Sequence, residues 1–351
     1  MHTVKFYGQL PGVHNFANRQ SFIDAVIQIA GWAEEHGLTG ALVFFNHGVL
    51  DPWAVSSVVL HQTRMMVPLV AVQPYMYPPY TAAKMIRTLS YLYDRRIDVN
   101  MITGTVPREF REVGDGLDHE QRYRRLHEYV TVLRLLLESE EPITFDGEFY
   151  RLSQARFQTF IPHARLRPRI FVAGSSEFGV ETALRVADVL VTHPGPVFHY
   201  RDHLRLLKTG NRKVEQAIRL ELIARRTAEE AWAFAKSKYP YNRQSEIQLV
   251  IKSRSESRWN RTLAELALKS ETYDGVYWLG GYIYGETYCP ALVGSYEDVA
   301  RYLYEYIRLG VTCILIGSMY TAKEFAHFRE TIDCLRALGA AVREDGACAS
   351  L

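Results

Sequence analysis

Residues 96–137 read RIDVNMITGTVPREFREVGDGLDHEQRYRRLHEYVTVLRLLL. A short β-type run at 97–102 meets a turn-forming Thr103-Gly104-Thr105, an irregular link follows at 107–116, and a long amphipathic helix opens at Asp118. In α/β enzymes, ligands bind where parallel strands end in small and polar residues. The stretch therefore predicts a strand-to-helix unit with a candidate ligand site at the end of its strand.

The start of the long helix has its own signature. The Asp118 side chain can cap the first turn, and Gln121 stands where it would complete a capping box. Apolar residues then recur at helical spacing, which predicts a face packed against a sheet. They are Leu126, Tyr129, Val130, Leu133, Leu136 and Leu137.

Strand-like and helix-like segments alternate along the chain. The strand candidates are 3–8, 40–45, 66–73, 97–102, 169–174, 188–193, 218–225 and 312–317. The helix candidates are 20–36, 52–62, 80–93, 118–138, 176–187, 198–208, 227–237 and 322–338. Eight alternations in 351 residues predict an α/β fold of the (β/α)8 TIM-barrel class. A doubly wound sheet is the alternative, but no G-x-G-x-x-G follows the first strand.

Two long insertions interrupt the alternation, after the fourth and the seventh strand. The first spans about 139–168 and contains a hairpin-like FDGEFYRL at 145–152. The second spans about 238–311 and holds many of the 22 tyrosines, which either line a pocket or pack in a core or interface. Long loops after barrel strands commonly serve the active-site end. We therefore expect a single barrel domain over 1–351.

Composition limits the partners and the compartment. The 41 basic and 39 acidic residues nearly cancel and form no basic arm, so a nucleic-acid partner is not expected. Neither a signal-peptide pattern nor an apolar run long enough to cross a bilayer is present, so we expect a cytoplasmic protein without a membrane partner. The four cysteines lack zinc or disulfide spacing, which fits a reducing compartment. They are Cys289, Cys313, Cys334 and Cys348.

Two strand ends carry groups that suit a phosphorylated ring. Ala173-Gly174-Ser175-Ser176 joins a strand to a helix, where amides and hydroxyls can hold a phosphate. The alternative is that serine only caps the helix and glycine makes the turn. Asn100 and Thr103 can hydrogen-bond a flat ring, or can satisfy the backbone of their own turn. By themselves the residues leave the phosphate site open, and they favour the turn-backbone alternative for Asn100 and Thr103.

Other polar residues suit acid–base chemistry. His47 follows the second strand, where a histidine can act as a general base or hydrogen-bond an oxyanion, and His14 follows the first strand. Arg219 and Glu221 lie two apart on the seventh strand and so point the same way, as a functional pair or a structural ion pair. Three further histidines show no ligand spacing with nearby carboxylates, so we expect no metal. They are His119, His127 and His163.

Taken together, these motifs resemble the bacterial luciferase-like superfamily, and most closely its flavin-dependent alkanesulfonate monooxygenase group. The shared pattern comprises N-x-x-T-G at 100–104, G-D-G at 114–116, D-H-x-x-R-Y at 118–123, F-D-G at 145–147 and a G-G-S-S turn that appears as Ala173-Gly174-Ser175-Ser176. The passage from Leu292-Val293-Gly294 to Leu315-Ile316-Gly317 is also similar. The resemblance spans most of the chain and is weakest over 194–290.

The resemblance implies a reduced-FMN-dependent monooxygenase of a two-component system. Asn100 and Thr103 would contact the isoalloxazine side of FMN, and Tyr123, Ser175 and Ser176 would hold its phosphate, with Gly174 letting the backbone approach. Reduced FMN and O2 would give a flavin peroxide that oxygenates an organic small molecule, while the protein excludes water. An NAD(P)H-dependent flavin reductase would supply the reduced FMN, and we expect a homodimer by analogy.

The substrate end departs from the alkanesulfonate pattern. Glu221 stands where that group has a histidine, its lid arginine falls near Tyr284-Gly285, and its cysteine falls at Val49. His47 instead lies nearer the catalytic histidine of luciferase-type members, and Tyr320 matches a retained tyrosine. We expect catalytic roles for His47, Arg219, Glu221 and Tyr320, and substrate contacts from His14 and Tyr284.

The expected substrate is an organic molecule other than a simple alkanesulfonate. The tyrosine-rich second insertion favours a larger one, such as a natural-product intermediate. Two alternatives stay open. One is a deazaflavin-dependent oxidoreductase on the same fold, and the other is a flavin-binding protein without catalysis.

Overall fold

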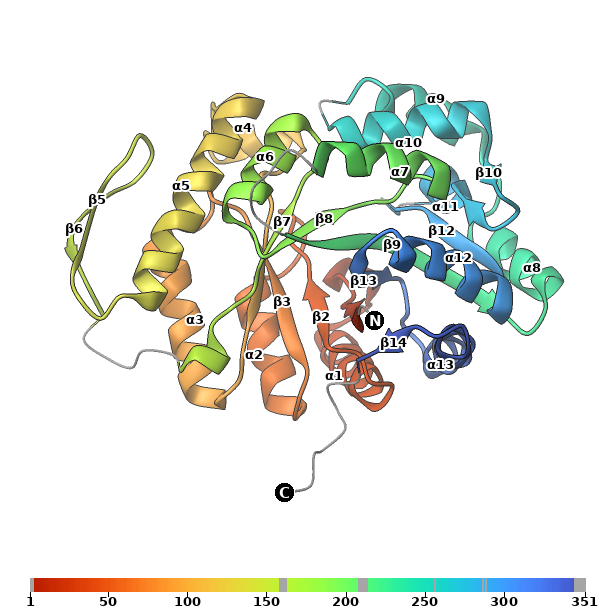
Figure 1. Cartoon of the computed structure of the whole chain (residues 1–351), viewed down its shortest axis with the longest axis horizontal. Coiled ribbons are helices and arrows are strands. Elements are labelled where there is room, and N and C mark those ends of the chain that lie inside the picture. The colour runs from red at the N-terminus through yellow and green to blue at the C-terminus, as the bar shows by residue number, and fades with distance from the viewer. Residues whose placement is uncertain are drawn as a thin grey trace.

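The computed structural model describes residues 3–157, 163–207, 214–255, 257–285, 287 and 289–343. Eight parallel strands close into a barrel surrounded by helices (Figure 1). The barrel strands are β1 (Thr3–Gln9), β2 (Gly40–Val43), β3 (Val67–Val72), β4 (Asp98–Met101), β7 (Ile170–Ala173), β8 (Val189–Thr192), β9 (Glu215–Arg225) and β13 (Val311–Gly317). Pairing of β13 with β1 closes the ring. The predicted (β/α)8 barrel is confirmed, and the doubly wound alternative is wrong.

Helices connect the barrel strands and pack on their outer face. They are α1 (Arg19–Glu35), α2 (Pro52–Gln62), α3 (Pro79–Tyr93), α5 (His119–Glu138), α6 (Glu177–Val186), α7 (Val197–Leu207), α12 (Tyr296–Arg308) and α13 (Ala322–Ala337). All predicted strands and helices are present, including the predicted helix at 227–237, which is α8 (Ala228–Lys238). The one helix of this layer that was not predicted is α12, which lies inside the expected second insertion.

The start of α5 has the predicted capping box. The Asp118 carboxylate accepts a hydrogen bond from the Gln121 amide (2.8 Å), and the Gln121 side chain accepts one from the Asp118 amide (3.0 Å). All six apolar residues predicted for its inner face are buried. The link before this helix contains a short helix, α4 (Pro107–Glu112), where only irregular chain was expected.

Side chains from all around the ring meet inside the barrel. One cluster contains Tyr7, Leu42, Leu69, Phe171, Val189, Val191, Ala217, Cys313 and Leu315. Because alternate residues of a strand face the same side, this cluster identifies the inward-pointing positions of each strand. β4 contributes the buried Asp98, whose carboxylate accepts hydrogen bonds from the Tyr7 hydroxyl (3.3 Å) and the Arg169 amide (2.8 Å). The interior is therefore a packed core rather than a channel.

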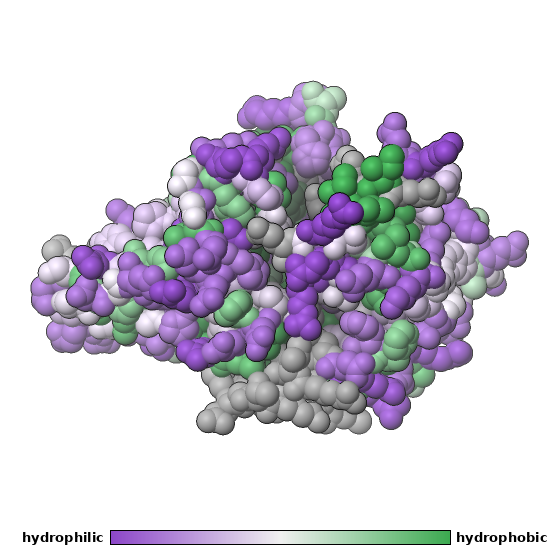
Figure 2. Space-filling view, turned by 90° about the horizontal axis from the view of Figure 1, so that it is seen from above, coloured by the Kyte–Doolittle hydropathy of each residue, from purple (hydrophilic) through white to green (hydrophobic). Residues whose placement is uncertain are grey.

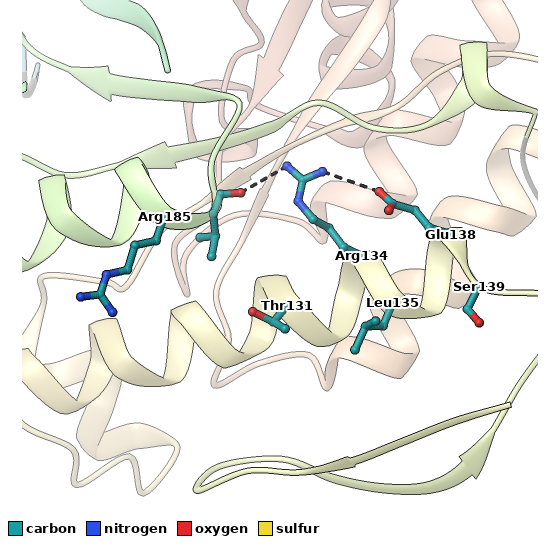
Figure 3. A pocket seen from close by; sticks show the side chains of 7 residues that line it. Thr131, Arg134, Leu135, Glu138, Ser139 and Arg185 are labelled. Atoms are coloured by element: carbon teal, nitrogen blue, oxygen red, sulfur yellow. Dashed lines mark hydrogen bonds and ion pairs between the residues drawn. The ribbon is translucent and has the colours of Figure 1, made fainter. Parts of the chain in front are cut away.

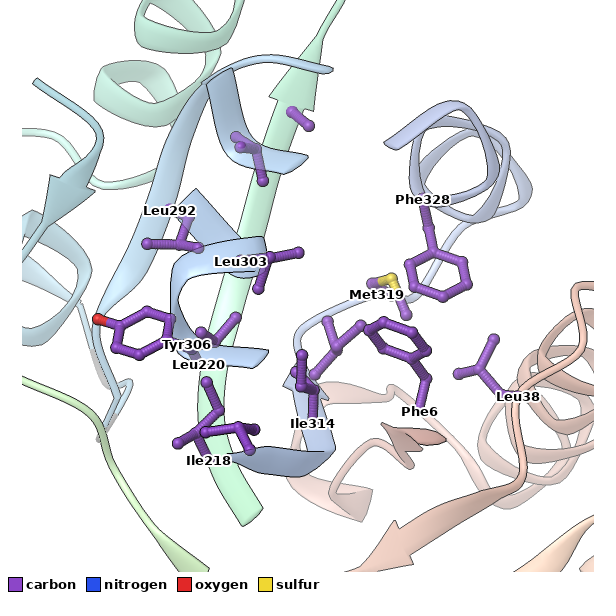
Figure 4. Close-up of a cluster of buried hydrophobic side chains, with 14 of the residues drawn as sticks. Phe6, Leu38, Ile218, Leu220, Leu292, Leu303, Tyr306, Ile314, Met319 and Phe328 are labelled. Atoms are coloured by element: carbon purple, nitrogen blue, oxygen red, sulfur yellow. The ribbon is translucent and has the colours of Figure 1, made fainter. Parts of the chain in front are cut away.

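The helix layer packs on the outward faces of the strands. Figure 4 shows Leu303 and Tyr306 of α12 beside Ile218 and Leu220 of β9, within one buried cluster. On the other side of the same cluster, the Phe6 and Phe328 rings meet edge to face at 5.4 Å. Fully burying a large apolar side chain contributes about 1.5–3 kcal/mol, so these contacts hold α12 and α13 on the barrel.

The first insertion contains the predicted hairpin. Strands β5 (Ile143–Asp146) and β6 (Arg151–Ala155) are antiparallel, with Asp146 opposite Arg151. The Glu128 carboxylate of α5 accepts hydrogen bonds from the amides of Glu148 (2.9 Å) and Phe149 (2.9 Å) in the turn. These bonds tie the hairpin to α5. Residues 158–162 of this insertion lie outside the described part of the chain.

The second insertion is built on the barrel sheet. Its elements after α8 are α9 (Arg243–Lys252), α10 (Arg258–Lys269), β10 (Thr272–Tyr273), β11 (Tyr277–Trp278), α11 (Gly280–Tyr284) and β12 (Ala291–Ser295). Glu221 of β9 pairs with Gly317 on one edge and with Ala291 on the other. β12 therefore lies on the same edge of β9 as β8 and extends the sheet beyond the end of that strand.

Several tyrosines of this segment are core residues. Tyr277, Tyr282 and Tyr306 are completely buried in the large hydrophobic cluster. The core-packing alternative therefore holds for these three tyrosines.

No helix within the described ranges is long and apolar enough to span a membrane. Cys289, Cys313 and Cys334 are free thiols, and Cys348 lies outside the described residues.

Candidate functional site

The carboxyl ends of the barrel strands present one layer of inward-pointing residues. Continuing the alternation of the interior cluster along each strand gives Gln9, Phe44, Ala71, Asn100, Ala173, His193, Arg219 and Gly317, which we call the barrel mouth. Three of these residues are alanine or glycine, so space is left above the core. Figure 2 looks onto this end of the molecule and shows a hollow near its centre. In this fold, active sites form at this end.

On one side of the mouth, polar groups that follow β4 and β7 contact one another. The Thr103 and Ser176 side chains adjoin the buried Tyr123 hydroxyl of α5, where they oppose the rise in the pKa of Tyr123 that burial causes. A Cβ atom added at Gly174 would come within 3.0 Å of the same hydroxyl, so only glycine fits there without a shift. The structure thus brings Asn100, Thr103, Tyr123, Gly174 and Ser176 to one side, and we call them the β4–β7 cluster.

The turn after β7 leads into the N-terminus of α6. The Ser176 hydroxyl accepts a hydrogen bond from the Gly179 amide (3.2 Å), so the capping role weighed for this serine is real. The His119 Nε2 atom also lies 3.2 Å from this hydroxyl. Gly174 and Ser175 precede the helix, where the helix dipole favours an anion. Ser176 can therefore cap α6 while the turn at Gly174 and Ser175 binds an anion.

Several buried polar atoms around the mouth have no hydrogen-bond partner among the described residues. They are the Gln73 Oε1, Tyr75 hydroxyl, Asn100 Oδ1, His47 Nε2, His193 Nε2 and Arg219 Nε atoms. Buried polar groups are normally paired, because an unpaired one costs about 1–3 kcal/mol. Unpartnered atoms also occur elsewhere in the described chain, and the six around the mouth are available to a polar ligand bound there.

Across the mouth, Arg219 lies in a hydrogen-bonded chain. Its Nη2 atom donates to the Gln9 side-chain oxygen (2.6 Å), and the Gln9 side-chain Nε2 atom donates to the Tyr320 hydroxyl (3.3 Å). Burial raises the pKa of Tyr320 to about 12, with Arg219 opposing the rise and Glu221 adding to it. The Tyr320 phenol is therefore neutral at physiological pH and can donate a proton in a hydrogen bond.

Glu221 sits beside this chain in a different set of contacts. Its carboxylate, 2% exposed, accepts hydrogen bonds from the Tyr239 hydroxyl (2.8 Å) and the Ser318 hydroxyl (2.5 Å). The Lys238 ammonium lies 3.7 Å away. The predicted common direction of Arg219 and Glu221 is realised, but within the described chain they bind other partners instead of forming the ion pair. We call Gln9, Arg219, Glu221, Ser318 and Tyr320 the β9–β13 cluster.

Ser318 holds an unusual backbone conformation at the end of β13. Its φ of 61° lies in the left-handed region, which non-glycine residues seldom adopt. This conformation accompanies the short hydrogen bond to Glu221, so local strain is retained where the carboxylate is positioned.

His193 is a mouth residue that sequence reasoning missed. Its ring stacks on the Trp259 ring of α10, with centroids 5.1 Å apart and planes 11° from parallel. Burial lowers the pKa of the His193 imidazole well below its usual range, and the charge of Arg219 adds to the effect. The ring is partly exposed as a whole, whereas its Nε2 atom is inaccessible. The sequence does contain a signal for His193, because this residue continues the alternation of the inward-pointing Val189 and Val191 along β8.

His47 is held by α4, the helix that was not expected. Its amide donates to the Glu109 carboxylate (3.1 Å), and its Nδ1 atom is 2.6 Å from a carboxylate oxygen of Glu112. A proton on Nδ1 in this hydrogen bond leaves a lone pair on the buried, unpartnered Nε2 atom. This arrangement is that of an oriented base.

The two predicted substrate contacts lie in different places. His14 is exposed and follows β1, and its ring covers Gly12 next to Phe44 of the mouth. The Tyr284 hydroxyl donates to Glu271 (3.1 Å) and its ring contacts Tyr241, so these interactions stay within the second insertion. His14 is at the rim as predicted, and a substrate contact from Tyr284 stays a prediction.

A separate surface pocket lies between α5 and α6 (Figure 3). Arg134 crosses it, with its guanidinium bound to Glu138 (3.7 Å), Asp188 (2.9 Å) and the Val186 carbonyl (3.2 Å). The pocket is formed by the C-terminal turns of α5 and α6, which lead to the amino ends of barrel strands. It therefore lies at the end of the barrel opposite the mouth. The charge of Arg134 in this pocket is neutralised by its acidic partners.

The chain shows similarity to known proteins over nearly its whole length. A family model described as luciferase-like monooxygenase matches residues 10–313. The chain is 54% identical over 326 residues to the 4-(gamma-L-glutamylamino)butanoyl-[BtrI acyl-carrier protein] monooxygenase BtrO of Niallia circulans, covering 93% of this chain and 95% of the relative.

Solved structures share the fold at low identity. The long-chain alkane monooxygenase LadA has a TM-score of 0.74 at 18% identity, covering 97% of this chain and 92% of that chain. An F420-dependent secondary alcohol dehydrogenase, in complex with an F420-acetone adduct, has a TM-score of 0.65 at 18% identity, covering 96% and 100%. These likenesses establish the architecture alone.

Proposed function

Because the chain belongs to the luciferase-like monooxygenase family, we propose that it is a reduced-FMN-dependent monooxygenase of a two-component system, acting on an acyl group linked to an acyl carrier protein. Family membership and the 54%-identical relative make it a monooxygenase, in place of the alternative of a binder without catalysis. The cofactor, the electron source and the substrate are the proposed part. The relative supports the substrate class, since its name specifies a carrier-bound acyl group.

The observation that carries the cofactor assignment is the set of unpartnered polar atoms around the mouth, where three of the eight positions are alanine or glycine. A flat ring with carbonyl and N–H groups along its edge can satisfy such atoms while it fills the space that Ala71, Ala173 and Gly317 leave. The Gly174 turn, closed around the Tyr123 hydroxyl, suits the phosphate of the same ligand.

The β4–β7 cluster would hold FMN. Asn100 and Thr103 would hydrogen-bond the ring, while Tyr123, Ser175 and Ser176 would hold the phosphate beside Gly174. When bound, reduced FMN supplies the electrons that activate O2. A separate NAD(P)H-dependent flavin reductase would deliver the reduced form, and a homodimer is the expected assembly.

The chain's own ionisable groups would move protons and orient the substrate. Transfer of one oxygen atom to a C–H bond releases the other as water, so a donor and an acceptor of protons are both required. Tyr320 and Arg219 offer donors at the mouth, and the Nε2 lone pair of His47 offers an acceptor. Glu221 would position Tyr239 and Ser318 around the bound substrate.

The charges of Arg219 and Glu221 also suit the acyl group named for the relative. A γ-linked glutamyl group keeps a free α-carboxylate and a free α-ammonium at the end remote from the thioester. Arg219 and Glu221 present opposite charges from the same side of β9, which complements such a pair. Simple alkanesulfonates offer no cation for Glu221.

The decisive experiment combines anaerobic titration with isotope labelling. The protein is titrated with oxidised FMN, reduced FMN and a reduced deazaflavin, and the reduced complexes are mixed with ¹⁸O2 and the carrier-bound 4-(γ-L-glutamylamino)butanoyl substrate. We expect tight binding of reduced FMN and one labelled oxygen atom in the product. Binding and turnover with the deazaflavin alone, or a product without label, would contradict the proposal.

A further inference from the structure

The outer face of α9 carries exposed apolar side chains between arginines. Ile247, Val250 and Ile251 are 66%, 44% and 59% exposed, although they belong to a folded helix. Residues three, four, seven and eight apart share one face of a helix, so these three lie on the same face as Arg243. We call Arg243, Ile247, Val250, Ile251 and Arg254 the α9 face.

The inner side of α9 is the packed one. Leu249 is 6% exposed, and the Lys252 ammonium donates to the Tyr282 carbonyl (2.7 Å) while lying over the Tyr282 ring. The exposed apolar residues of the α9 face therefore belong to a helix whose opposite side is packed against the protein. Figure 2 shows apolar side chains gathered over the part of the molecule where Figure 1 has α9 and α10. Exposed apolar groups rimmed by charge mark interaction sites.

The charge around this face is positive. Residues 243–269 contain six basic and three acidic residues, a net charge of +3, whereas the whole chain carries only +2. Arg243, Arg254 and Arg258 are exposed. A second copy of the chain docked through the same face would bring these arginines together, because a two-fold contact pairs a patch with itself. Charge complementarity favours an acidic partner instead.

The α9 face lies next to the route into the site. The turn after α9 leads to α10, whose Trp259 stacks on His193 of the barrel mouth, and His193 adjoins Arg219. A partner seated on the α9 face would thus stand beside the charged side of the mouth. An acyl chain attached to that partner could pass Trp259 to reach the β9–β13 cluster.

We infer that the α9 face, with Arg258, is the docking surface for an acidic face of the carrier protein that presents the acyl substrate. This inference rests on the proposed function, because it takes the carrier-bound acyl group as the substrate. The arginines steer and orient the carrier, and Ile247, Val250 and Ile251 supply the apolar centre of the contact. The mouth recognises the acyl group, whereas the α9 face recognises the carrier.

The test compares a carrier-bound substrate with a free one. The 4-(γ-L-glutamylamino)butanoyl group is supplied as a thioester of the acyl carrier protein and as a thioester of pantetheine. The test variant is Arg243→Glu/Arg254→Glu/Arg258→Glu. The control is Arg151→Glu/Arg185→Glu/Arg329→Glu, which makes the same charge change at exposed arginines on β6, α6 and α13.

The test variant should lower kcat/KM for the carrier-bound substrate about tenfold or more, through KM, and leave the pantetheine thioester unchanged. Added salt should lower the kcat/KM of the wild type for the carrier-bound substrate toward that of the test variant. The control variant should have the kcat/KM of the wild type. Ile247→Ser/Ile251→Ser should show the same substrate dependence with less sensitivity to salt. Equal losses on both substrates, or no loss on the carrier, would overturn the inference, as would a changed oligomeric state in sedimentation velocity.

Direct titration with the carrier protein separates this inference from the proposed function. If the wild type oxygenates neither thioester, the proposed substrate class fails, but binding can still be measured. Carrier binding that the test variant weakens and the control preserves would support the docking surface. Wild-type protein that does not bind the carrier at low salt, or a test variant that binds it equally well, would overturn it.

Discussion

The two sides of the barrel mouth solve the same problem, the placement of polar groups in a packed interior, by different means. The β4–β7 cluster uses neutral hydroxyl and amide groups, with Tyr123 linking Thr103 and Ser176. The β9–β13 cluster uses charges, with Arg219 on Gln9 and Glu221 among Tyr239, Ser318 and Lys238. The order of strands in the barrel places these two clusters opposite one another.

The difference fits a division of labour. A neutral ring and its phosphate need directed hydrogen bonds and close approach, which glycine and hydroxyl groups provide. A substrate that gains and loses protons and carries charges needs fixed charges near it. If this division is correct, changes on one side should leave the task of the other side intact.

The largest expected effect is on the charged side. Arg219→Ala removes a guanidinium that is bound to Gln9 and next to His193, and we expect product formation, as kcat/KM, to fall about 100-fold. The Kd of reduced FMN, measured by fluorescence titration, should stay within about twofold of wild type. Arg219→Lys keeps the charge but not the planar fork and should recover only part of the activity. A parallel loss of FMN affinity would erase the distinction between the sides.

The next effect tests the neutral side with one added methyl group. Gly174→Ala places a Cβ atom 3.0 Å from the Gly179 Cα and Tyr123 hydroxyl oxygen, so the turn must shift, and we expect FMN to bind about tenfold more weakly. Gly116→Ala is the matched control, since a Cβ atom there meets nothing within 4 Å. Saturating FMN should restore turnover in Gly174→Ala. Wild-type affinity in this variant would remove Gly174 from the cofactor site.

A smaller effect compares two helix caps. Ser176 caps α6 on the neutral side, and Ser257 caps α10, which carries Trp259 on the charged side. Ser176→Ala and Ser257→Ala should each lower the free energy of unfolding by about 1 kcal/mol in urea denaturation. FMN affinity should fall only in Ser176→Ala. Equal FMN affinities in the two variants would show that Ser176 has a structural role alone.

The smallest effect concerns the pH dependence of stability. The folded protein keeps His193 neutral because burial and Arg219 lower its pKa, whereas the unfolded chain binds a proton below about pH 6.5. Stability is therefore lost as the pH falls through this range, by about 1.4 kcal/mol at one pH unit below the unfolded pKa. In urea denaturation, the free energy of unfolding of His193→Gln should therefore fall less between pH 7.5 and pH 5.5 than that of the wild type. An unchanged difference between the two pH values would mean that His193 is not held neutral.

The sequence predicted the neutral side better than the charged side for a physical reason. Asn100, Thr103 and Tyr123 belong to one strand-to-helix unit, and Gly174 and Ser176 belong to the turn after β7. Local periodicity and capping place these residues, and the register of neighbouring parallel strands then brings the two units together. The barrel itself follows from the same local alternation.

The charged side depends on contacts between distant parts of the chain. Arg219 meets Gln9 across 210 positions, and Glu221 meets Ser318 across 97. No local pattern fixes such pairs, so their partners were not predicted. The missed helix α12 is different, because Ser295 and the buried stripe from Val299 to Ile307 were readable as a capped helix.

The pairing of β12 with β9 has a consequence for how such enzymes diversify. Residues 226–290 leave the sheet at the end of β9 and return to the edge of the same strand. The segment that carries the α9 face thus has both of its ends next to one strand. A chimera that exchanges this segment between relatives, cut at these two ends, keeps the ring of strands unbroken while it changes what the enzyme recognises.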